Sequence, residues 1–205
     1  MKKRVYVLCM MIAVVAMLGW IVENVFMAIT CGCIDNRSMY FPFLLGYGVG
    51  IAVIYLMLGT PQELTFFGKP IVVGSKAKRI TIYMMEAILL VCIGEIIIGT
   101  VVEKVCGFVW WNYTAYPLHI TKYTSIPTSF LFAVLITVFM NFCFHPMMRF
   151  FEKWNGIVLQ VVSVVLMVIM IGDFLYAAYQ MYETHWLLIR WRIILNEEVF
   201  LEAMQ

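Results

Sequence analysis

The feature that most constrains this chain is a series of apolar runs, each close to the length that crosses a membrane. A helix needs roughly 20 mostly apolar residues to span the hydrocarbon core of a bilayer. Five segments approach or exceed this length: about 5–30, 43–60, 80–104, 125–148 and 156–181. A transmembrane β-barrel would instead show segments of about 10 residues that alternate between apolar and polar side chains. Because these runs are continuous, we predict an all-α bundle of about five transmembrane helices in a single domain, residues 1–205.

Composition excludes the other broad classes of protein. Hydrophobic residues make up 64% of the chain and charged residues 13%, with a mean hydropathy of +0.94. A soluble domain is about 45–50% apolar and about 25% charged. Disordered chains have low hydrophobicity and high charge. A formal charge of +2 without a basic face also argues against nucleic-acid binding.

The N-terminus resembles a signal peptide in one respect, since Lys2, Lys3 and Arg4 precede the first apolar run. That run extends to Thr30, whereas the apolar region of a signal peptide has about 7–15 residues. No small-residue cleavage site follows it. We therefore expect a retained first span.

Lysine and arginine predict the orientation, because cytoplasmic loops carry an excess of them. With five spans and the N-terminus inside, nine basic residues lie on the cytoplasmic side: Lys2, Lys3, Arg4, Lys69, Lys76, Lys78, Arg79, Arg149 and Lys153. The other five lie outside: Arg37, Lys104, Lys122, Arg190 and Arg192. We predict a multi-pass protein of the plasma membrane with its N-terminus inside and its C-terminus outside.

The tail, residues 182–205, mixes aromatic and basic residues with aliphatic ones between His185 and Arg192. This mixture is typical of a short helix that lies in the membrane interface. A buried packing helix fits the same pattern.

Ionisable residues inside the spans are the main functional signal, because each costs at least about 2.5–3.5 kcal/mol to insert at the bilayer centre. The spans hold five acids and two amides: Glu23, Glu86, Glu95, Glu103, Asp173, Asn24 and Asn141. In the predicted orientation, all the acids except Glu86 lie in the outer halves of their helices. Arg37, in the first outer loop, is the nearest obvious cation.

Two interpretations fit these acids. In the first, Glu23, Glu95 and Asp173 line a polar cavity that opens to the outside beneath the aromatic loop 105–124. In the second they form a structural network in which Arg37 pairs with Glu23 or Glu95. The spacing of Glu95, Gly99 and Glu103 places all three on one helix face, and the glycine permits close approach of another segment.

Four motifs in order carry a resemblance to a known family. They are Gly19-Trp20-Ile21-Val22-Glu23, then Asn36-Arg37, then Glu95, Gly99 and Glu103 at four-residue spacing, then Trp111-Asn112-Tyr113-Thr114. The chain resembles the CmpB-type membrane proteins, also described as ABC-transporter type IV. The resemblance covers about residues 19–48 and 95–130. It implies the membrane component of a transporter.

The chain departs from the pattern of this family at three positions. Asn112 stands where the family has Asp, Thr114 where it has Ser, and Ser38 where it has Gly. If the family aspartate binds a cation, this chain has lost that charge at Asn112.

No phosphate-binding GxxxxGK[ST] motif occurs, so an ATP-binding subunit would be a separate chain. We expect a transport component with an outward-facing site for a small solute or cation. The candidate binding residues are Glu23, Arg37, Glu95, Glu103, Trp111, Asn112, Tyr113 and Asp173. No catalytic residue, metal or cofactor is predicted. Expected partners are membrane lipids, the ATP-binding subunit and further copies of this chain.

Two alternatives stay open. An integral membrane enzyme or binding protein for a lipid-linked substrate would use Glu23 or Glu95 as acid or base and Arg37 to hold a phosphate or carboxylate. A non-catalytic scaffold or sensor would use the buried charges only to pair its helices.

The cysteines on the outer side, Cys31, Cys33 and Cys106, are expected to be free packing residues. Binding of a soft metal by Cys31 and Cys33, or a disulfide to Cys106, are the alternatives.

Overall fold

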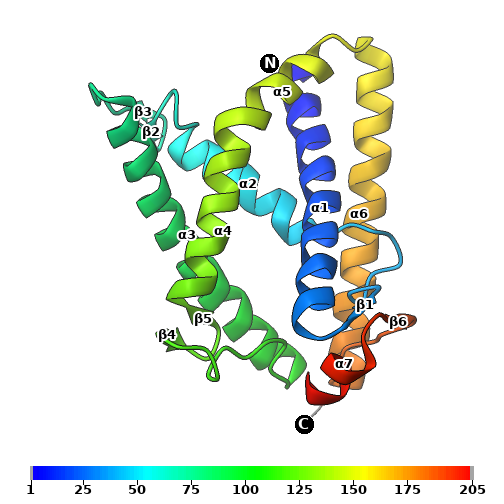
Figure 1. Ribbon diagram of the computed structural model, residues 1–205. Helices are drawn as coiled ribbons and strands as arrows, with labels where there is room; N and C mark the ends of the chain where they lie inside the picture. The colour runs from blue at the N-terminus through cyan, green and yellow to red at the C-terminus, as the bar shows by residue number, and fades with distance from the viewer. Residues whose placement is uncertain (1, 204–205) are drawn as a thin grey trace. The chain divides into compact units, whose positions relative to one another are not determined.

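The computed structural model describes residues 2–203 and consists mainly of helices (Figure 1). Within these described residues, four helices are long and apolar enough to cross a membrane: Lys3–Thr30, Lys76–Cys106, Ile126–Glu152 and Gly156–Thr184. They correspond to four of the five predicted spans, and the predicted all-α membrane fold is confirmed. The helices group into two compact units, residues 1–50 with 151–205 and residues 51–150, which we describe separately.

The second predicted span, 43–60, is shorter in the structure. Its helix, α2 (Leu45–Leu58), has 14 residues, which at 1.5 Å per residue gives about 21 Å. The hydrocarbon core of a bilayer is about 30 Å thick. Gly59, with φ of 68°, follows the helix in the left-handed conformation that commonly ends helices. The part of the chain that the structure describes thus has four long apolar helices and one shorter apolar helix, α2. The side of the membrane on which each loop lies stays a prediction.

The first unit is built on two long helices, α1 (Lys2–Thr30) and α6 (Gly156–Thr184), which pack side by side (Figure 1). Ala13 and Ala16 of α1 are buried together with Met170 of α6. Small side chains at such a contact let two helix backbones approach closely. The first turns of α2 belong to this unit, and the Leu44 amide before them donates a 2.9 Å hydrogen bond to the Ala16 carbonyl of α1.

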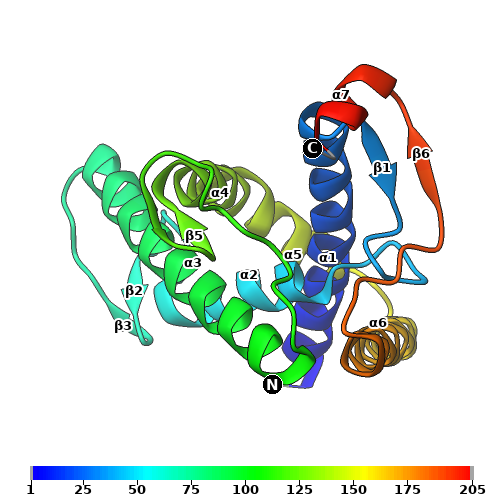
Figure 2. The ribbon, with the colours of Figure 1, turned by 90° about the horizontal axis from the view of Figure 1, so that it is seen from below.

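The C-terminal tail returns to the first loop of the same unit. Strand β1 (Cys33–Asp35) pairs antiparallel with β6 (Arg192–Ile194), with Asp35 opposite Arg192 (Figure 2). The interfacial helix predicted between His185 and Arg192 is therefore absent there, because the β1 edge supplies main-chain partners for the end of this segment. A short helix, α7 (Glu197–Ala203), follows instead.

The second unit is built on α3 (Lys76–Cys106) and on a second long helix in three parts, α4 (Ile126–Val138), η1 (Phe139–Cys143) and α5 (Phe144–Glu152). The η1 segment is one π-helical turn inside the span. Helices α3 and α4 pack against each other. Two short hairpins complete the unit: β2 (Thr65–Phe66) with β3 (Lys69–Pro70), and β4 (His119–Thr121) with β5 (Thr124–Ser125).

Candidate functional site

The predicted site residues divide between the two units. Glu23, Arg37 and Asp173 lie in the first, and Glu95, Glu103, Trp111, Asn112 and Tyr113 lie in the second. Within each unit they belong to a local polar cluster. A single cavity lined by both clusters stays a prediction.

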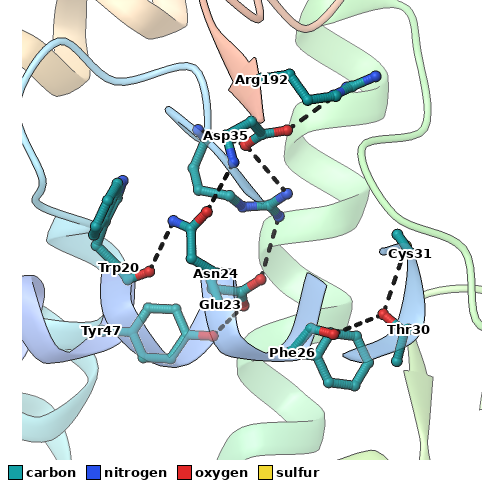
Figure 3. Close-up of polar contacts among 10 residues, drawn as sticks. Trp20, Glu23, Asn24, Phe26, Thr30, Cys31, Asp35, Tyr47 and Arg192 are labelled. Atoms are coloured by element: carbon teal, nitrogen blue, oxygen red, sulfur yellow. Dashed lines mark hydrogen bonds and ion pairs between the residues drawn. The ribbon is translucent and has the colours of Figure 1, made fainter. Parts of the chain in front are cut away.

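In the first unit, Glu23 of α1 bonds to the first loop and to α2 (Figure 3). Its Oε2 lies 3.2 Å from Nη2 of Arg37, and its Oε1 accepts a hydrogen bond from the hydroxyl of Tyr47. The side chains of Arg37 and Glu23 are 23% and 22% exposed. This is one of the two pairings that the sequence left open for Arg37. Gly19 lies one turn before Glu23, and a Cβ there would collide with the Tyr47 ring.

Asp35 is an acid that sequence reasoning missed. Its side chain is 1% exposed and lies 3.9 Å from Arg37 and 3.6 Å from Arg192 (Figure 3). The main-chain N–H of Asp35 donates a 2.8 Å hydrogen bond to the side-chain Oδ1 of Asn24, which lies in the first span. The available signal was an acid directly before the Asn36-Arg37 motif. Asp35 therefore joins the end of α1, the first loop and the tail.

Asp173 of α6 is 7% exposed and accepts hydrogen bonds from the main chain of the first loop. The amides of Tyr40 and Phe41 each lie 2.9 Å from one of its oxygens. Backbone N–H donors stabilise a buried carboxylate without needing a cation. Asp173 thus fastens this loop to α6.

Arg190 of the tail covers the same loop. Its guanidinium carbon lies 3.5 Å from the centre of the Tyr40 ring, and its Nη1 donates a 3.2 Å hydrogen bond to the Ser38 carbonyl. A cation over an aromatic face is attracted by the ring quadrupole. The first loop is therefore enclosed between α6 and the tail.

In the second unit, Glu95 of α3 lies among hydroxyl groups. Thr124 and Ser129 donate hydrogen bonds of 2.5 and 3.1 Å to its Oε2, and the two hydroxyl oxygens lie 2.9 Å apart. Both hydroxyl residues are fully buried. Neither Thr124 nor Ser129 is among the candidate binding residues that the sequence suggested. The available signal was the run of hydroxyl residues that begins the fourth span.

Glu103 lies two turns further along α3 and binds the neighbouring part of the same loop. Its carboxylate lies 2.6 Å from Nζ of Lys122 and accepts a hydrogen bond from the hydroxyl of Tyr123. This carboxylate raises the pKa of Lys122, since its hydrogen bond favours the charged amine, and it raises the pKa of the Tyr123 phenol. Between the two acids, Gly99 lies against the Tyr123 ring, where a Cβ would collide with it. Residues 122–124 therefore lie against the face of α3 that Glu95, Gly99 and Glu103 form.

The aromatic loop supports this arrangement. The indole N–H of Trp111 donates a 2.8 Å hydrogen bond to the Tyr123 carbonyl. Asn112 accepts a 2.9 Å hydrogen bond from the Thr114 amide, which closes a local turn. The Tyr113 amide donates to the Lys122 carbonyl at 2.8 Å. These three predicted residues shape the loop that carries Thr124.

No disulfide joins any two cysteines among residues 2–203. Burial raises the pKa of the Cys33 thiol, which makes it a weaker nucleophile and metal ligand. Among residues 2–203, no group of three or more His, Cys, Asp and Glu side chains is placed to hold a metal ion.

Comparison with known proteins identifies the family. The family model described as putative ABC-transporter type IV matches residues 10–178. No curated protein and no solved structure matches the chain. The matched region includes all four motifs that carried the resemblance and well over half of the sequence. The chain therefore belongs to the ABC-transporter type IV family of membrane proteins.

Proposed function

We propose that this chain is the membrane component of a transporter and that Glu95, Thr124 and Ser129 form its binding site for a cation or for the cationic group of a small solute. Family membership and the four long apolar helices support the transport role. The carboxylate site and the class of solute are inferred from the contacts of the acids.

The surroundings of Glu95 carry the assignment. Glu95 accepts hydrogen bonds from two buried hydroxyls, those of Thr124 and Ser129. Hydroxyl oxygens can turn their lone pairs toward a cation when their protons point elsewhere. A carboxylate with two hydroxyls therefore offers a set of oxygen ligands, which hard cations prefer.

The other predicted residues would position this site. Glu103, Lys122 and Trp111 hold the loop so that Thr124 reaches Glu95. We propose that Glu23, Arg37 and Asp173 organise the first loop in the same way, and that both loops face outside. Asn112 and Tyr113 would shape the entrance to the site.

Energy would come from a separate ATP-binding subunit. The segment of residues 61–79 contains Lys69 and, at the start of α3, Lys76, Lys78 and Arg79, and we propose it as the docking segment for that subunit. A tagged chain purified from native membranes in mild detergent should carry a stoichiometric ATP-binding protein, identified by mass spectrometry. Charge removal at Lys76 and Lys78 should reduce its recovery. A chain that purifies without any ATP-binding protein would contradict this part of the proposal.

The cation site can be tested on the purified chain. We expect Na⁺, K⁺ or NH₄⁺ to raise the thermal unfolding midpoint at constant ionic strength, with choline as the replacement cation. A ligand at 100 times its Kd stabilises a folded protein by about 2.7 kcal/mol. Glu95→Gln should abolish the cation effect, and Ser129→Ala should weaken it.

Glu86→Gln is the matched control, since it removes an acid from the same helix at a position outside the proposed site, and it should retain the cation effect. Unfolding that is independent of all three cations in the unmodified chain would contradict the proposed site and favour a purely structural role for Glu95.

A further inference from the structure

A pocket of about 480 Å³ lies in the second unit, where the loop after α2 meets the second half of the long helix that α4, η1 and α5 form. Gln62 and Glu63 line it from the loop, and Asn141, Phe142, His145 and Arg149 line it from η1 and α5. Its volume is within the range of roughly 300–1,000 Å³ that is typical of small-ligand sites. No residue of the proposed cation site lines this pocket.

A local defect in the helix shapes the pocket. Pro146 has no N–H and cannot donate to the carbonyl of Phe142, four residues earlier. Just before it the helix widens into the π-turn η1, where the Phe144 amide donates to the Phe139 carbonyl. Such π-turns inside α-helices are frequently found at functional sites. The turn brings Asn141 to the wall of the pocket.

The polar wall of the pocket is held in place by hydrogen bonds. The side-chain amide of Gln62 donates to the carbonyl and to Oδ1 of Asn141, at 2.5 and 2.8 Å. The hydroxyl of Thr60 lies 3.1 Å from Nε2 of His145. These hydrogen bonds join the loop after α2 to η1 and α5, and together the two segments form the polar wall of the pocket.

Two opposite charges face this pocket without neutralising each other. Glu63 and Arg149 both line it, and neither forms an ion pair with any described residue. A ligand that carries a cation and an anion would pair with both side chains at once.

An apolar stripe leads to the pocket along the same helix. Leu131, Leu135, Val138 and Phe142 are 51%, 43%, 50% and 66% exposed. Their spacing of three or four residues places them on one face, and Phe142 also lines the pocket. An aliphatic chain can lie along this face while a polar head occupies the pocket.

We propose that this pocket binds the head group of a zwitterionic phospholipid. Arg149 binds the phosphate, for which its planar guanidinium is well suited. Glu63 binds the ammonium group. The acyl chains lie along the stripe from Phe142 to Leu131.

Native mass spectrometry of the purified chain tests this assignment, with phosphatidylethanolamine and phosphatidylglycerol of identical acyl chains as probes. We expect phosphatidylethanolamine to bind about tenfold more tightly, the factor that one charge-assisted contact supplies. Arg149→Gln should weaken binding of both lipids. Glu63→Gln should remove the preference between them. Glu152→Gln and Lys153→Gln make the same charge changes at neighbouring exposed positions outside the pocket, and they should leave both affinities unchanged.

Equal binding of the two lipids by the unmodified chain would overturn the proposal, as would equal losses in the control variants. Soluble phosphoethanolamine, added at the concentration of the lipid, should not displace it. Displacement would show that the acyl chains contribute nothing, and it would overturn the assignment to a lipid.

Discussion

Ser38 adopts a backbone conformation that normally favours glycine. Its φ is 64°, and that of the preceding Arg37 is 51°. A left-handed conformation costs a residue with a Cβ roughly 1–2 kcal/mol. The Ser38 hydroxyl is also buried without a hydrogen-bond partner. This is the position at which the family pattern has glycine, so the departure noted in the sequence has a structural cost.

Ser38→Gly should therefore stabilise the protein. The gain should be about 0.5–1.5 kcal/mol after the entropic cost of glycine in the unfolded chain. It can be measured as a rise in the thermal unfolding midpoint in detergent. Ser163→Gly, at a buried helical position of α6, should lower that midpoint instead. A lowered midpoint for Ser38→Gly would contradict this account of the loop.

Gly99 permits a close approach between α3 and the Tyr123 ring in the second unit. Gly99→Ala would push a methyl group into the Tyr123 ring and displace the loop that binds Glu95 and Glu103. Overpacking of this kind typically costs about 1–3 kcal/mol. Gly94→Ala on the same helix meets no atom within 4 Å and should be neutral or slightly stabilising. Equal unfolding midpoints for the two variants would show that the loop can move aside freely.

At the scale of elements, α3 and the loop before α4 are joined by an ion pair with a predictable pH dependence. The folded pKa of Lys122 is raised above its usual value by the Glu103 carboxylate. A raised pKa means that the pair contributes its full stability below the unfolded pKa of about 10.4 and loses it as the pH rises through the folded pKa.

Lys122→Gln should therefore destabilise the protein by a constant amount between about pH 7 and pH 9, below the unfolded pKa. The difference from the unmodified chain should shrink above about pH 10.5, where the unmodified chain also loses its charge. Chemical unfolding at several pH values measures this difference. A difference that persists undiminished to high pH would show that Lys122 acts through packing.

At the scale of the whole molecule, the short helix α2 decides how many times the chain crosses the membrane. Its 14 residues reach about 21 Å, and they would cross only where the bilayer thins around them. Five crossings place the two termini on opposite sides. Four would place them on the same side.

The basic residues predict the N-terminus inside and the C-terminus outside. Alkaline phosphatase, which is active only outside the cytoplasm, should therefore be active when fused to the C-terminus and inactive at the N-terminus. A fluorescent protein that folds only in the cytoplasm should give the reverse result. Fluorescence at both ends would show that α2 does not cross the membrane.

The membrane class, four of the spans and the family were all accessible from the amino-acid sequence. The reason is physical, since a lipid environment requires long apolar segments whose backbone groups form hydrogen bonds within the segment. Such segments can be recognised directly in the amino-acid sequence. The acids inside those runs were visible for the same reason, because each is costly there. The motif at Glu95, Gly99 and Glu103 could be assigned to one face from helical periodicity alone.

What each acid binds was decided only by the tertiary structure. Asp35 and Arg192 are far apart in the sequence and meet because β6 pairs with β1. Thr124 reaches Glu95 because Gly99 lets Tyr123 lie against α3. The tail has no regular secondary structure from His185 to Trp191, where the pattern of its residues predicted a helix, and it then forms β6. Periodicity reports the face of an element on which a residue lies, whereas contacts between distant segments depend on how loops close, and loops follow no period.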